Sequence, residues 1–445
     1  MLKTKSVAFY TLGCKLNFSE TSTIGRQLTD IGFDKTKFEN KADLYVINTC
    51  SVTENANREC RRIIRKAKRI SPDSMVVVTG CYAQLKPEAI AKISGVDMVL
   101  GAKDKFNLPK LLTNINKKQT EKIHGCEIDN LNYHSSFSLN DRSRSFLKIQ
   151  DGCDYPCTYC TIPLARGKSR CDSIKNIVEN VKNIAENNIK EVVLTGVNIG
   201  KFEDSNTNEN FYDLIKKLEK VGGIERYRIS SIEPNLITDK IIDFVKQSKK
   251  FMPHFHIPMQ SGSDAILGKM KRRYNNALYK NKIQAITKAI PNVCIGADVI
   301  VGFPGETEEE FNKTLHFIKD SPISYLHVFT YSERENTEAI HFDGVVNKQQ
   351  RAERSNTLRI LSDKLQSNFY QKYLETTQTA LFEKENKEGF LYGFTENYIR
   401  VKIPFSEKYV QKTLKIKLLS FDKNTNIESE VLLVRTTSQQ LATNN

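Results

Sequence analysis

The sequence predicts an α/β protein built from three successive regions. Apolar strand segments alternate with amphipathic helical segments over residues 1–130 and again over residues 140–370. Residues 372–440 instead show short alternating strands that follow closely on one another. The first pattern is typical of parallel sheets covered by helices, and the second is typical of a small β-barrel. A chain of 445 residues has room for about two to four such domains.

The first region is expected to form a doubly wound parallel sheet, which carries helices on both faces. Strands are predicted at residues 7–11, 43–48, 75–79 and 97–100, and helices at 20–31, 55–70 and from Pro87 onward. The helix at 55–70 is basic on one side, and its apolar side consists of Ile63, Ile64, Ala67 and Ile70. Ligands of such sheets bind beyond the carboxyl ends of the strands.

The second region contains six predicted strands, at residues 145–149, 191–195, 227–231, 255–258, 294–301 and 325–330. Helical segments such as 174–186, 275–289 and 307–320 separate most of them, and a long helix follows at 349–373. Thr307 and Glu310 match a capping box, which predicts a helix start directly after a turn at Pro304 and Gly305.

The third region is expected to close into a small β-barrel, because strands are predicted at residues 379–383, 388–392, 398–403 and 413–420. Its aromatic residues Phe390, Tyr392, Phe394 and Tyr398 have two interpretations. They stack on nucleic-acid bases, or they fill the barrel core. We expect about half of them in the core.

The chain is basic: Lys and Arg number 67 against 52 Asp and Glu, a formal net charge of +15. Such a surplus favours a polyanionic partner, because phosphates that bind clustered cations release counterions. A generally basic, soluble surface is the alternative. No apolar run approaches the ~18 residues of a membrane span, so no membrane segment is expected. Ten cysteines without an export signal favour a reducing, cytoplasmic compartment and metal ligation over disulfides.

Three cysteines stand within eight residues: Cys153, Cys157 and Cys160, spaced Cys-x3-Cys-x2-Cys. No fourth cysteine lies at ligand spacing, whereas a closed electron-transfer cluster or a structural zinc site would want four ligands. Three thiolates on one loop can hold three irons of a 4Fe–4S cluster and leave the fourth iron open for a substrate or cofactor. Three incidental buried thiols are the alternative.

Cys14, Cys50 and Cys81 follow the first three predicted strands by one to three residues. Because the carboxyl ends of parallel strands meet at one edge of a sheet, these thiols are expected to lie together. They predict a second three-ligand cluster site, and the alternative is that small residues are common in such loops. The remaining cysteines lack this placement and are interpreted as core or surface thiols: Cys60, Cys126, Cys171 and Cys294.

The central cysteine pattern is the one carried by radical S-adenosylmethionine (SAM) enzymes, and the whole chain resembles their methylthiotransferase family. The matching segments are residues 10–17 (Tyr-Thr-Leu-Gly-Cys-Lys-Leu-Asn), 48–53, 78–84, 148–160, 162–168, 194–198, 256–263 and 296–306. The resemblance implies a (β/α)6 partial barrel over residues 140–370 and an OB-like TRAM domain, which binds tRNA, over residues 372–440. One departure is Asn336, where the family usually has glycine; among other residues, Asn best tolerates positive φ.

The resemblance also implies two 4Fe–4S clusters, SAM and the residues that hold them. Cys153, Cys157 and Cys160 would hold the cluster that binds and splits SAM. A second, sulfur-carrying cluster would be held by Cys14, Cys50 and Cys81. Contacts to SAM are implied for Tyr159, Thr195, Gly196, Asn198, Glu233, Gln260, Ile300 and Gly302. Any single Glu or Gln can instead cap a helix or satisfy a backbone group.

Two branches of this family modify an adenosine beside the tRNA anticodon, at position 37, and a third modifies an aspartate of a ribosomal protein. Residues 10–17 most resemble the branch that acts on N6-threonylcarbamoyladenosine. The isopentenyladenosine branch usually has Gln-Met-Asn where Lys15, Leu16 and Asn17 stand. The implied reaction inserts a methylthio group at C2. The alternatives are the two other substrates, or a non-catalytic iron–sulfur protein that binds RNA or senses redox state.

The implied partners are the anticodon stem-loop of tRNA, an electron donor such as flavodoxin or ferredoxin, and a sulfur donor that the sequence does not reveal. RNA contacts are predicted at Arg61 and Arg65 of the basic helix, and at Arg272 and Arg273 near the barrel rim. For the helix, a solvated charged face is the alternative.

Overall fold

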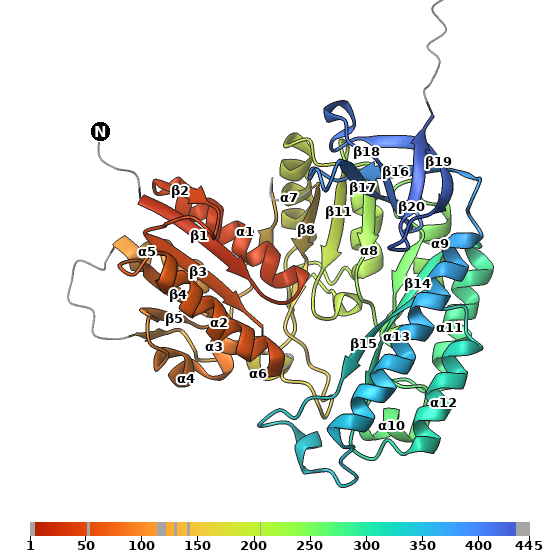
Figure 1. Ribbon diagram of the computed structural model, residues 1–445, viewed down its shortest axis with the longest axis horizontal. Helices are drawn as coiled ribbons and strands as arrows, with labels where there is room; N and C mark the ends of the chain where they lie inside the picture. The colour runs from red at the N-terminus through yellow and green to blue at the C-terminus, as the bar shows by residue number, and fades with distance from the viewer. Residues whose placement is uncertain are drawn as a thin grey trace, which may run out of the picture.

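The computed structural model describes residues 5–50, 54–113, 122–128, 131–139, 143–204 and 206–432 (Figure 1). It confirms the predicted α/β class, with a parallel sheet at the amino-terminal end, a partial barrel in the middle and a closed β-barrel at the carboxyl-terminal end. Motif residues 51–53 and the predicted region ends at 1–4, 129–130, 140 and 433–440 lie outside the described residues. Among the described helices, none is both long and apolar enough to cross a membrane.

The amino-terminal sheet has six parallel strands in the order β2-β1-β3-β4-β5-β6. They are β1 (Lys5–Thr11), β2 (Phe33–Thr36), β3 (Leu44–Thr49), β4 (Met75–Gly80), β5 (Met98–Leu100) and β6 (Ile123–His124). Every residue of the central strand β3 is buried, as expected of a strand covered on both faces. The prediction missed β2 and β6, because β2 is a short edge strand with two exposed polar residues and β6 has only two residues.

Helices cover both faces of this sheet, which confirms the doubly wound arrangement. One face is covered by α1 (Lys15–Asp30) and α5 (Leu108–Thr113). The other is covered by α2 (Glu54–Ile70), α3 (Cys81–Leu85) and α4 (Pro87–Ala91). In α2, Ile63, Ile64 and Ala67 are buried against the sheet, so the arginines of this helix lie on its outer side.

Six parallel strands form the partial barrel: β8 (Arg144–Lys148), β11 (Glu191–Thr195), β12 (Arg226–Ile229), β13 (His254–His256), β14 (Cys294–Val301) and β15 (Tyr325–Thr330). The strands form two groups, β12-β11-β8 and β13-β14-β15. Single bridges, such as that between Ser231 and His256, join the two groups between β12 and β13. β7 (Ser136–Phe137) adds an antiparallel edge to β8. A hairpin of β9 (Gln150–Asp151) and β10 (Arg170–Cys171) follows β8.

The helices of the partial barrel are α6 (Ile162–Arg166), α7 (Ile174–Glu186), α8 (Phe211–Glu219), α9 (Asp239–Gln247), α10 (Asp264–Lys269), α11 (Asn276–Ala289), α12 (Glu308–Lys319) and α13 (Lys348–Gln371). Thr307 caps α12 by accepting from the Glu310 amide at 3.3 Å. The reciprocal half of the predicted capping box is absent here, because the Glu310 carboxylate binds Ser263 and Lys313 instead. Asn336 adopts a φ of 63°, the conformation expected where the family has glycine.

The carboxyl-terminal barrel closes in the order β16-β17-β18-β20-β19. Its strands are β16 (Thr377–Phe382), β17 (Phe390–Thr395), β18 (Arg400–Pro404), β19 (Thr413–Phe421) and β20 (Ile427–Val431), the last of which was not predicted. It sits at the amino ends of the partial-barrel strands (Figure 1). There, the buried Arg226 and Arg228 donate to its main-chain carbonyls at 2.7–3.1 Å.

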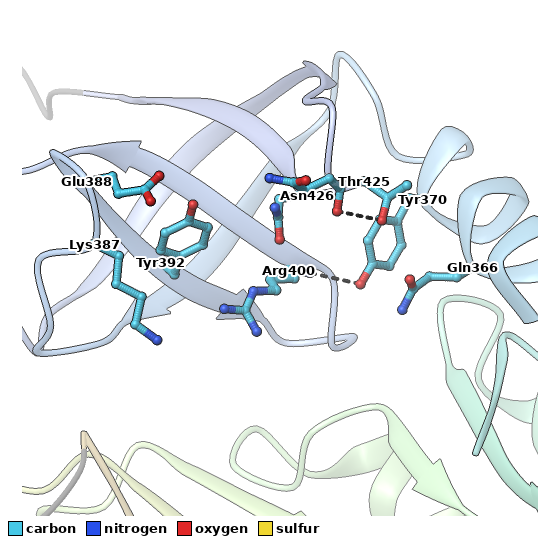
Figure 2. Close-up of a pocket in the computed structure, with 9 residues that line it drawn as sticks. Gln366, Tyr370, Lys387, Glu388, Tyr392, Arg400, Thr425 and Asn426 are labelled. Atoms are coloured by element: carbon cyan, nitrogen blue, oxygen red, sulfur yellow. Dashed lines mark hydrogen bonds between the residues drawn. The ribbon is translucent and has the colours of Figure 1, made fainter. Parts of the chain in front are cut away.

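The expectation that half of the aromatic residues fill this barrel's core is wrong for β17. Phe390, Tyr392 and Phe394 alternate with the buried positions of the strand and lie half-buried on its outer face. Tyr392 lines a depression of about 660 Å³, and the Arg400 guanidinium lies 5.1 Å from its ring centre. Figure 2 shows both side chains. Tyr398 packs against the edge of the core and stacks on His254 of the partial barrel, with ring centres 4.2 Å apart.

Candidate active site

Cys153, Cys157 and Cys160 lie on the loop between β9 and α6, beyond the carboxyl end of β8. Main-chain amides of Tyr155 and Ile162 donate to the Sγ atoms of Cys153 (3.4 Å) and Cys160 (3.5 Å). Donors to sulfur stabilise negative charge on a thiolate and tune an iron–sulfur cluster. The amide donors of this loop therefore stabilise anionic sulfur, and the loop lies at the end of the barrel where active sites of such folds are found.

Burial raises the pKa of all three thiols, that of Cys160 to about 12. As free groups they would stay protonated near neutral pH, which makes them poor nucleophiles. Metal coordination removes the proton of a ligating thiol outright. This donor set therefore fits a metal cluster better than thiol catalysis.

Arg272, predicted as an RNA contact, is buried instead, with its side chain 4% exposed. Its guanidinium donates to Cys157 Sγ (3.1 Å) and the Tyr159 hydroxyl (3.4 Å), and pairs with the Glu233 carboxylate. Because these groups occupy its donors, Arg272 is a positioning residue of the cysteine loop. Glu233, predicted as a SAM contact, is its counter-ion, although burial still raises the pKa of this carboxyl above its ordinary value.

Cys14, Cys50 and Cys81 come together at the carboxyl edge of the amino-terminal sheet, as the topology predicted. They follow β1, β3 and β4, which are neighbours in the sheet. A Cβ atom added at Gly13 would lie 3.0 Å from Cys50 Sγ, so the turn that carries Cys14 touches Cys50. Burial raises the pKa of Cys81, and the nearby Cys14 adds to this rise.

Neither cysteine trio is compact enough for a single ion. Among the described residues, His256, Asp298 and His327 are the three whose ligand atoms all lie within 4.8 Å of one another. In an iron–sulfur cluster each thiolate binds a different iron, so the ligand atoms must be spread more widely. Both trios are therefore candidates for a cluster rather than for one metal ion.

A buried network of charges, which the sequence did not predict, joins the two cysteine sites. Arg166 of α6 lies 3.0 Å from Glu20 of α1 and 2.9 Å from Asp151, and donates to Asn17 Oδ1 at 2.7 Å. Asn17 in turn donates to the carbonyl of Thr49, directly before Cys50, at 3.0 Å. Since Asp151 and Arg166 flank the central cysteine loop, this network fixes one trio relative to the other.

The network also carries a positive surplus. Lys105 and Lys148 pair with Glu20 at 2.7 and 3.3 Å, so three buried cations, including Arg166, meet two buried carboxylates, Glu20 and Asp151. Arg166 and Lys105 act on the thiol of Cys81 and favour its anionic form. This surplus complements the negative charge of thiolate-bound iron.

The loop after β11 contains Thr195, Gly196 and Asn198. Gln150 Oε1 accepts from the amides of Val197 and Asn198, at 2.9 and 2.8 Å, while Gln150 Nε2 donates to the carbonyl of Gly152 beside the cysteine loop. Thr195 Oγ1 and Asn198 Oδ1 are buried without a hydrogen-bond partner in the described residues. Most buried polar atoms in folded proteins have partners, so these two atoms are available to hydrogen-bond a ligand.

Beside Cys160 lies a cavity of about 200 Å³, lined in part by Tyr159, Gln260, Asp298 and Ile300. Three of these were predicted as SAM contacts, and Gln260 adopts a φ of 62° that turns the chain at this point. Gly302, also predicted as a SAM contact, is not among the residues that line this cavity. Its φ is 76°, and an added Cβ atom would lie 2.3 Å from Arg351 Cγ, so only glycine fits there.

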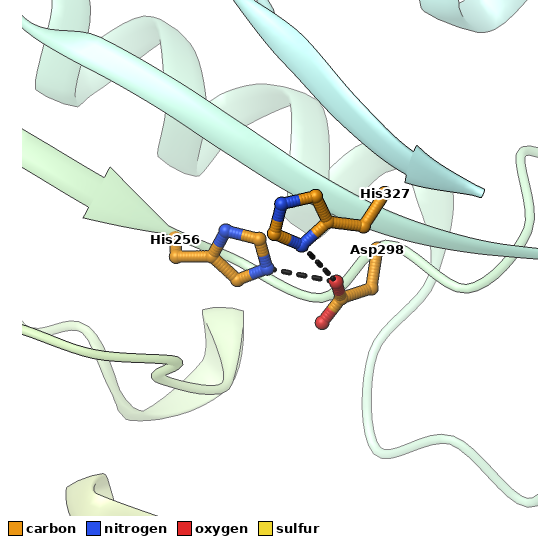
Figure 3. A group of neighbouring side chains, drawn as sticks. All are labelled: His256, Asp298 and His327. Atoms are coloured by element: carbon orange, nitrogen blue, oxygen red, sulfur yellow. Dashed lines mark hydrogen bonds and ion pairs between the residues drawn. The ribbon is translucent and has the colours of Figure 1, made fainter. Parts of the chain in front are cut away.

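Asp298 is held at this cavity by two histidines (Figure 3). His256 Nε2 and His327 Nδ1 lie 2.8 and 3.3 Å from the same carboxylate oxygen. On its other side, His256 Nδ1 lies 3.3 Å from the Tyr325 hydroxyl, which also meets His254 at 3.0 Å. Burial opposes ionisation, but the two histidines hold the pKa of Asp298 below its ordinary value.

The other predicted RNA contacts lie on the surface. Arg61 and Arg65 are exposed on α2, with Arg61 reaching the Tyr82 hydroxyl at 3.3 Å. Arg273 is exposed and lies 4.3 Å from the ring centre of Tyr155, next to the cysteine loop. These three cations keep access to solvent, which a phosphate contact requires.

Comparisons with known proteins agree with this geometry. The family model described as Uncharacterized protein family UPF0004 matches residues 6–101, and that of the Radical SAM superfamily matches residues 147–318. The threonylcarbamoyladenosine tRNA methylthiotransferase MtaB of Bacillus subtilis (strain 168) is 38% identical over 425 residues, which are 93% of this chain and 94% of that protein. The chain belongs to the MtaB family of radical SAM methylthiotransferases.

The chain is also similar to a second MtaB, to another tRNA-modifying enzyme and, in fold, to a solved radical SAM structure. MtaB of Rickettsia prowazekii (strain Madrid E) is 38% identical, with 90% and 91% of the two chains covered. A tRNA-2-methylthio-N(6)-dimethylallyladenosine synthase of Syntrophus aciditrophicus (strain SB) is 31% identical, with 89% and 86% covered. The solved structure of the radical SAM methyltransferase TsrM from Kitasatospora setae shares the fold, with a TM-score of 0.56 at 14% identity and 76% and 77% covered. As a radical SAM enzyme, the MtaB-family chain uses SAM and a 4Fe–4S cluster.

Proposed function

We propose that this protein inserts a methylthio group at C2 of N6-threonylcarbamoyladenosine, at position 37 next to the anticodon of tRNA. The observation that carries the proposal is the pair of cysteine trios, each at the carboxyl edge of its own parallel sheet and joined by the Glu20–Arg166 network. The substrate is the one in the printed names of the MtaB relatives.

Each trio fits one three-ligand 4Fe–4S cluster. Cys153, Cys157 and Cys160 would hold the cluster that binds SAM, and the second cluster would be held by Cys14, Cys50 and Cys81. When bound, SAM and its cluster supply the radical that removes hydrogen from C2, while the second cluster supplies sulfur and a further SAM the methyl group. The protein residues orient these groups and exclude water.

The predicted SAM contacts divide into two groups in this proposal. Thr195 and Asn198 contribute the buried polar atoms that lack partners, with Gly196 between them. Tyr159, Gln260 and Ile300 supply the cavity wall beside Cys160. The remaining two act indirectly: Glu233 through its pair with Arg272, and Gly302 through the turn that admits Arg351.

The target base must leave its stack before C2 can be reached, and unstacking costs least in a single-stranded loop. We propose that Arg61, Arg65 and Arg273 contact phosphates of the anticodon stem-loop, in keeping with the net charge of +15. Such a substrate places the protein in the cytoplasm, where a flavodoxin or ferredoxin would supply electrons.

The test uses anaerobically reconstituted protein with dithionite, SAM and synthetic anticodon stem-loops. The proposal predicts one 5′-deoxyadenosine and one S-adenosylhomocysteine per methylthio product, with the threonylcarbamoyladenosine stem-loop as substrate. A stem-loop that carries dimethylallyladenosine and a ribosomal protein are assayed in parallel. If methylthio product forms on one of these and not on the threonylcarbamoyladenosine stem-loop, the substrate must be reassigned. If no 5′-deoxyadenosine forms, the protein is not a radical enzyme and the non-catalytic alternative holds.

A further inference from the structure

A cavity of about 280 Å³ lies where the three regions of the chain meet. Cys14, Lys15 and Phe18 line it from the amino-terminal sheet and α1, Arg144 and Arg228 from the partial barrel, and Tyr398 from the carboxyl-terminal barrel. One wall therefore carries a cysteine of the proposed sulfur-carrying site. Another consists of aromatic rings, because Phe18 also packs edge-on against Phe146 at 5.6 Å.

Three cations face this cavity, but two of them are already occupied. Arg228 donates to Glu191 at 3.1 Å and to two carbonyls of the carboxyl-terminal barrel. Arg144 lies 3.6 Å from Glu191 and 3.5 Å from Glu383. Two arginines thus share the buried Glu191, and the three cations at this cavity meet two carboxylates, Glu191 and Glu383.

Lys15 differs from both arginines. Within the described ranges, its ammonium group makes no hydrogen bond or ion pair, although it lines the cavity beside Arg144 and Arg228. Lys15 is solvent-exposed, so its ammonium is available to pair with an anion that enters the cavity. Its position directly after Cys14 places that anion next to the sulfur-carrying site.

We propose that Lys15 binds the carboxylate of the threonyl group on the substrate base and thereby selects N6-threonylcarbamoyladenosine. The inference rests on the proposed function and names the residue that recognises the N6 substituent of the substrate. C2 and C6 flank N1 of adenine, and C6 carries N6, so C2 and the N6 group share one edge of the base. A base with C2 at the Cys14 wall therefore extends its N6 group along the same cavity. Lys15 and the carboxylate then neutralise each other.

The same geometry discriminates against an apolar N6 group. A dimethylallyl group carries no charge, so its entry would displace water from the Lys15 ammonium and leave the ammonium unpaired. A hydrogen bond to a charged partner contributes enough to change affinity by about ten- to a hundredfold. Selection by Lys15 would therefore appear in binding as well as in catalysis.

The experiment measures dissociation constants of labelled stem-loops by fluorescence anisotropy, with anaerobically purified protein that retains its iron. The stem-loops carry threonylcarbamoyladenosine or unmodified adenosine at the same position. Lys15→Gln should weaken binding of the modified stem-loop by about ten- to a hundredfold and that of the unmodified one less than about twofold. Lys15→Arg keeps the charge and should keep the preference. Lys175→Gln, an exposed lysine on α7, is the matched control.

Three results would overturn the inference. Equal losses on both stem-loops would make Lys15 a phosphate contact, and unchanged affinities would remove it from the site. If a folded, iron-loaded Lys15→Arg protein no longer binds the modified stem-loop more tightly than the unmodified one, the positive charge at this position is not what selects the substrate. Methylthio product is measured with the wild-type protein on the modified stem-loop in parallel. If no product forms, the proposed function is contradicted. If product forms but Lys15→Gln binds both stem-loops as tightly as the wild type does, only the role of Lys15 is contradicted.

Discussion

Glu20→Gln is expected to weaken the junction between the amino-terminal sheet and the partial barrel. The Glu20 carboxylate is completely buried and lies 2.7, 3.0 and 3.3 Å from Lys105, Arg166 and Lys148. The substitution leaves these three buried cations with one carboxylate, that of Asp151. Removing one partner of a buried ion pair typically costs about 3–5 kcal/mol, because the remaining charge is uncompensated.

Thermal unfolding followed by circular dichroism measures this cost. For cooperative units of about 150–250 residues, 1 kcal/mol shifts the midpoint by about 2–4 °C, so the expected fall is roughly 6–20 °C. Glu39→Gln is the control, since Glu39 is exposed and pairs with Lys66 at 3.3 Å; exposed pairs contribute about 1 kcal/mol or less. A Glu20→Gln midpoint that falls no further than that of the control would refute the reasoning.

The same network predicts a dependence on pH. Burial opposes ionisation, but Arg166, Lys105 and Lys148 hold the pKa of Glu20 well below its ordinary value. A depressed carboxyl pKa stabilises the folded state fully above the unfolded value, about 4.3, and this contribution is lost as pH falls below it. The difference in midpoint between wild type and Glu20→Gln should therefore shrink from pH 6 to pH 3. A constant difference would contradict the assignment of a charged Glu20.

The remaining predictions concern the cysteine sites and one turn. Cys81→Ala should lower bound iron from about eight to about four atoms per chain while 5′-deoxyadenosine still forms from SAM; unchanged iron, measured by colorimetric assay, would contradict the second cluster. Arg272→Met removes a donor to Cys157 Sγ and should lower the reduction potential of the central cluster in an EPR-monitored titration, whereas an unchanged potential would show that this contact does not tune it. Gly302→Ala forces a Cβ atom to 2.3 Å from Arg351 Cγ at a φ of 76° and should cost about 1–3 kcal/mol in urea unfolding; a neutral result would mean that the turn relaxes.

Topology explains why both cysteine trios were predictable. Parallel strands place their carboxyl ends at one edge, so Cys14, Cys50 and Cys81 converge although each stands alone in the sequence. The central trio, Cys153, Cys157 and Cys160, was predictable from its spacing in the sequence alone. Strand and helix positions were predictable for the same reason: long apolar segments such as β14 and β3 are fully or mostly buried, whereas the two-residue β6 carries almost no pattern.

The junction was not predictable, because its partners meet only after folding. Glu20 and Arg166 are 146 residues apart and lie on helices of different regions, α1 and α6, and in the local sequence each resembles an ordinary charged residue of a helix. Arg272 looked like a surface cation because Lys271 and Arg273 flank it, yet its side chain turns inward to Glu233 and Cys157. A charge within a basic run says little about the direction in which it points.

The central claim is tested most directly by mass spectrometry of tRNA nucleosides from a strain that lacks this gene. The account predicts that the 2-methylthio derivative of N6-threonylcarbamoyladenosine disappears while N6-threonylcarbamoyladenosine itself remains, and that the intact gene restores the derivative whereas one encoding Cys81→Ala does not. An undiminished methylthio nucleoside in the deletion strain would contradict it.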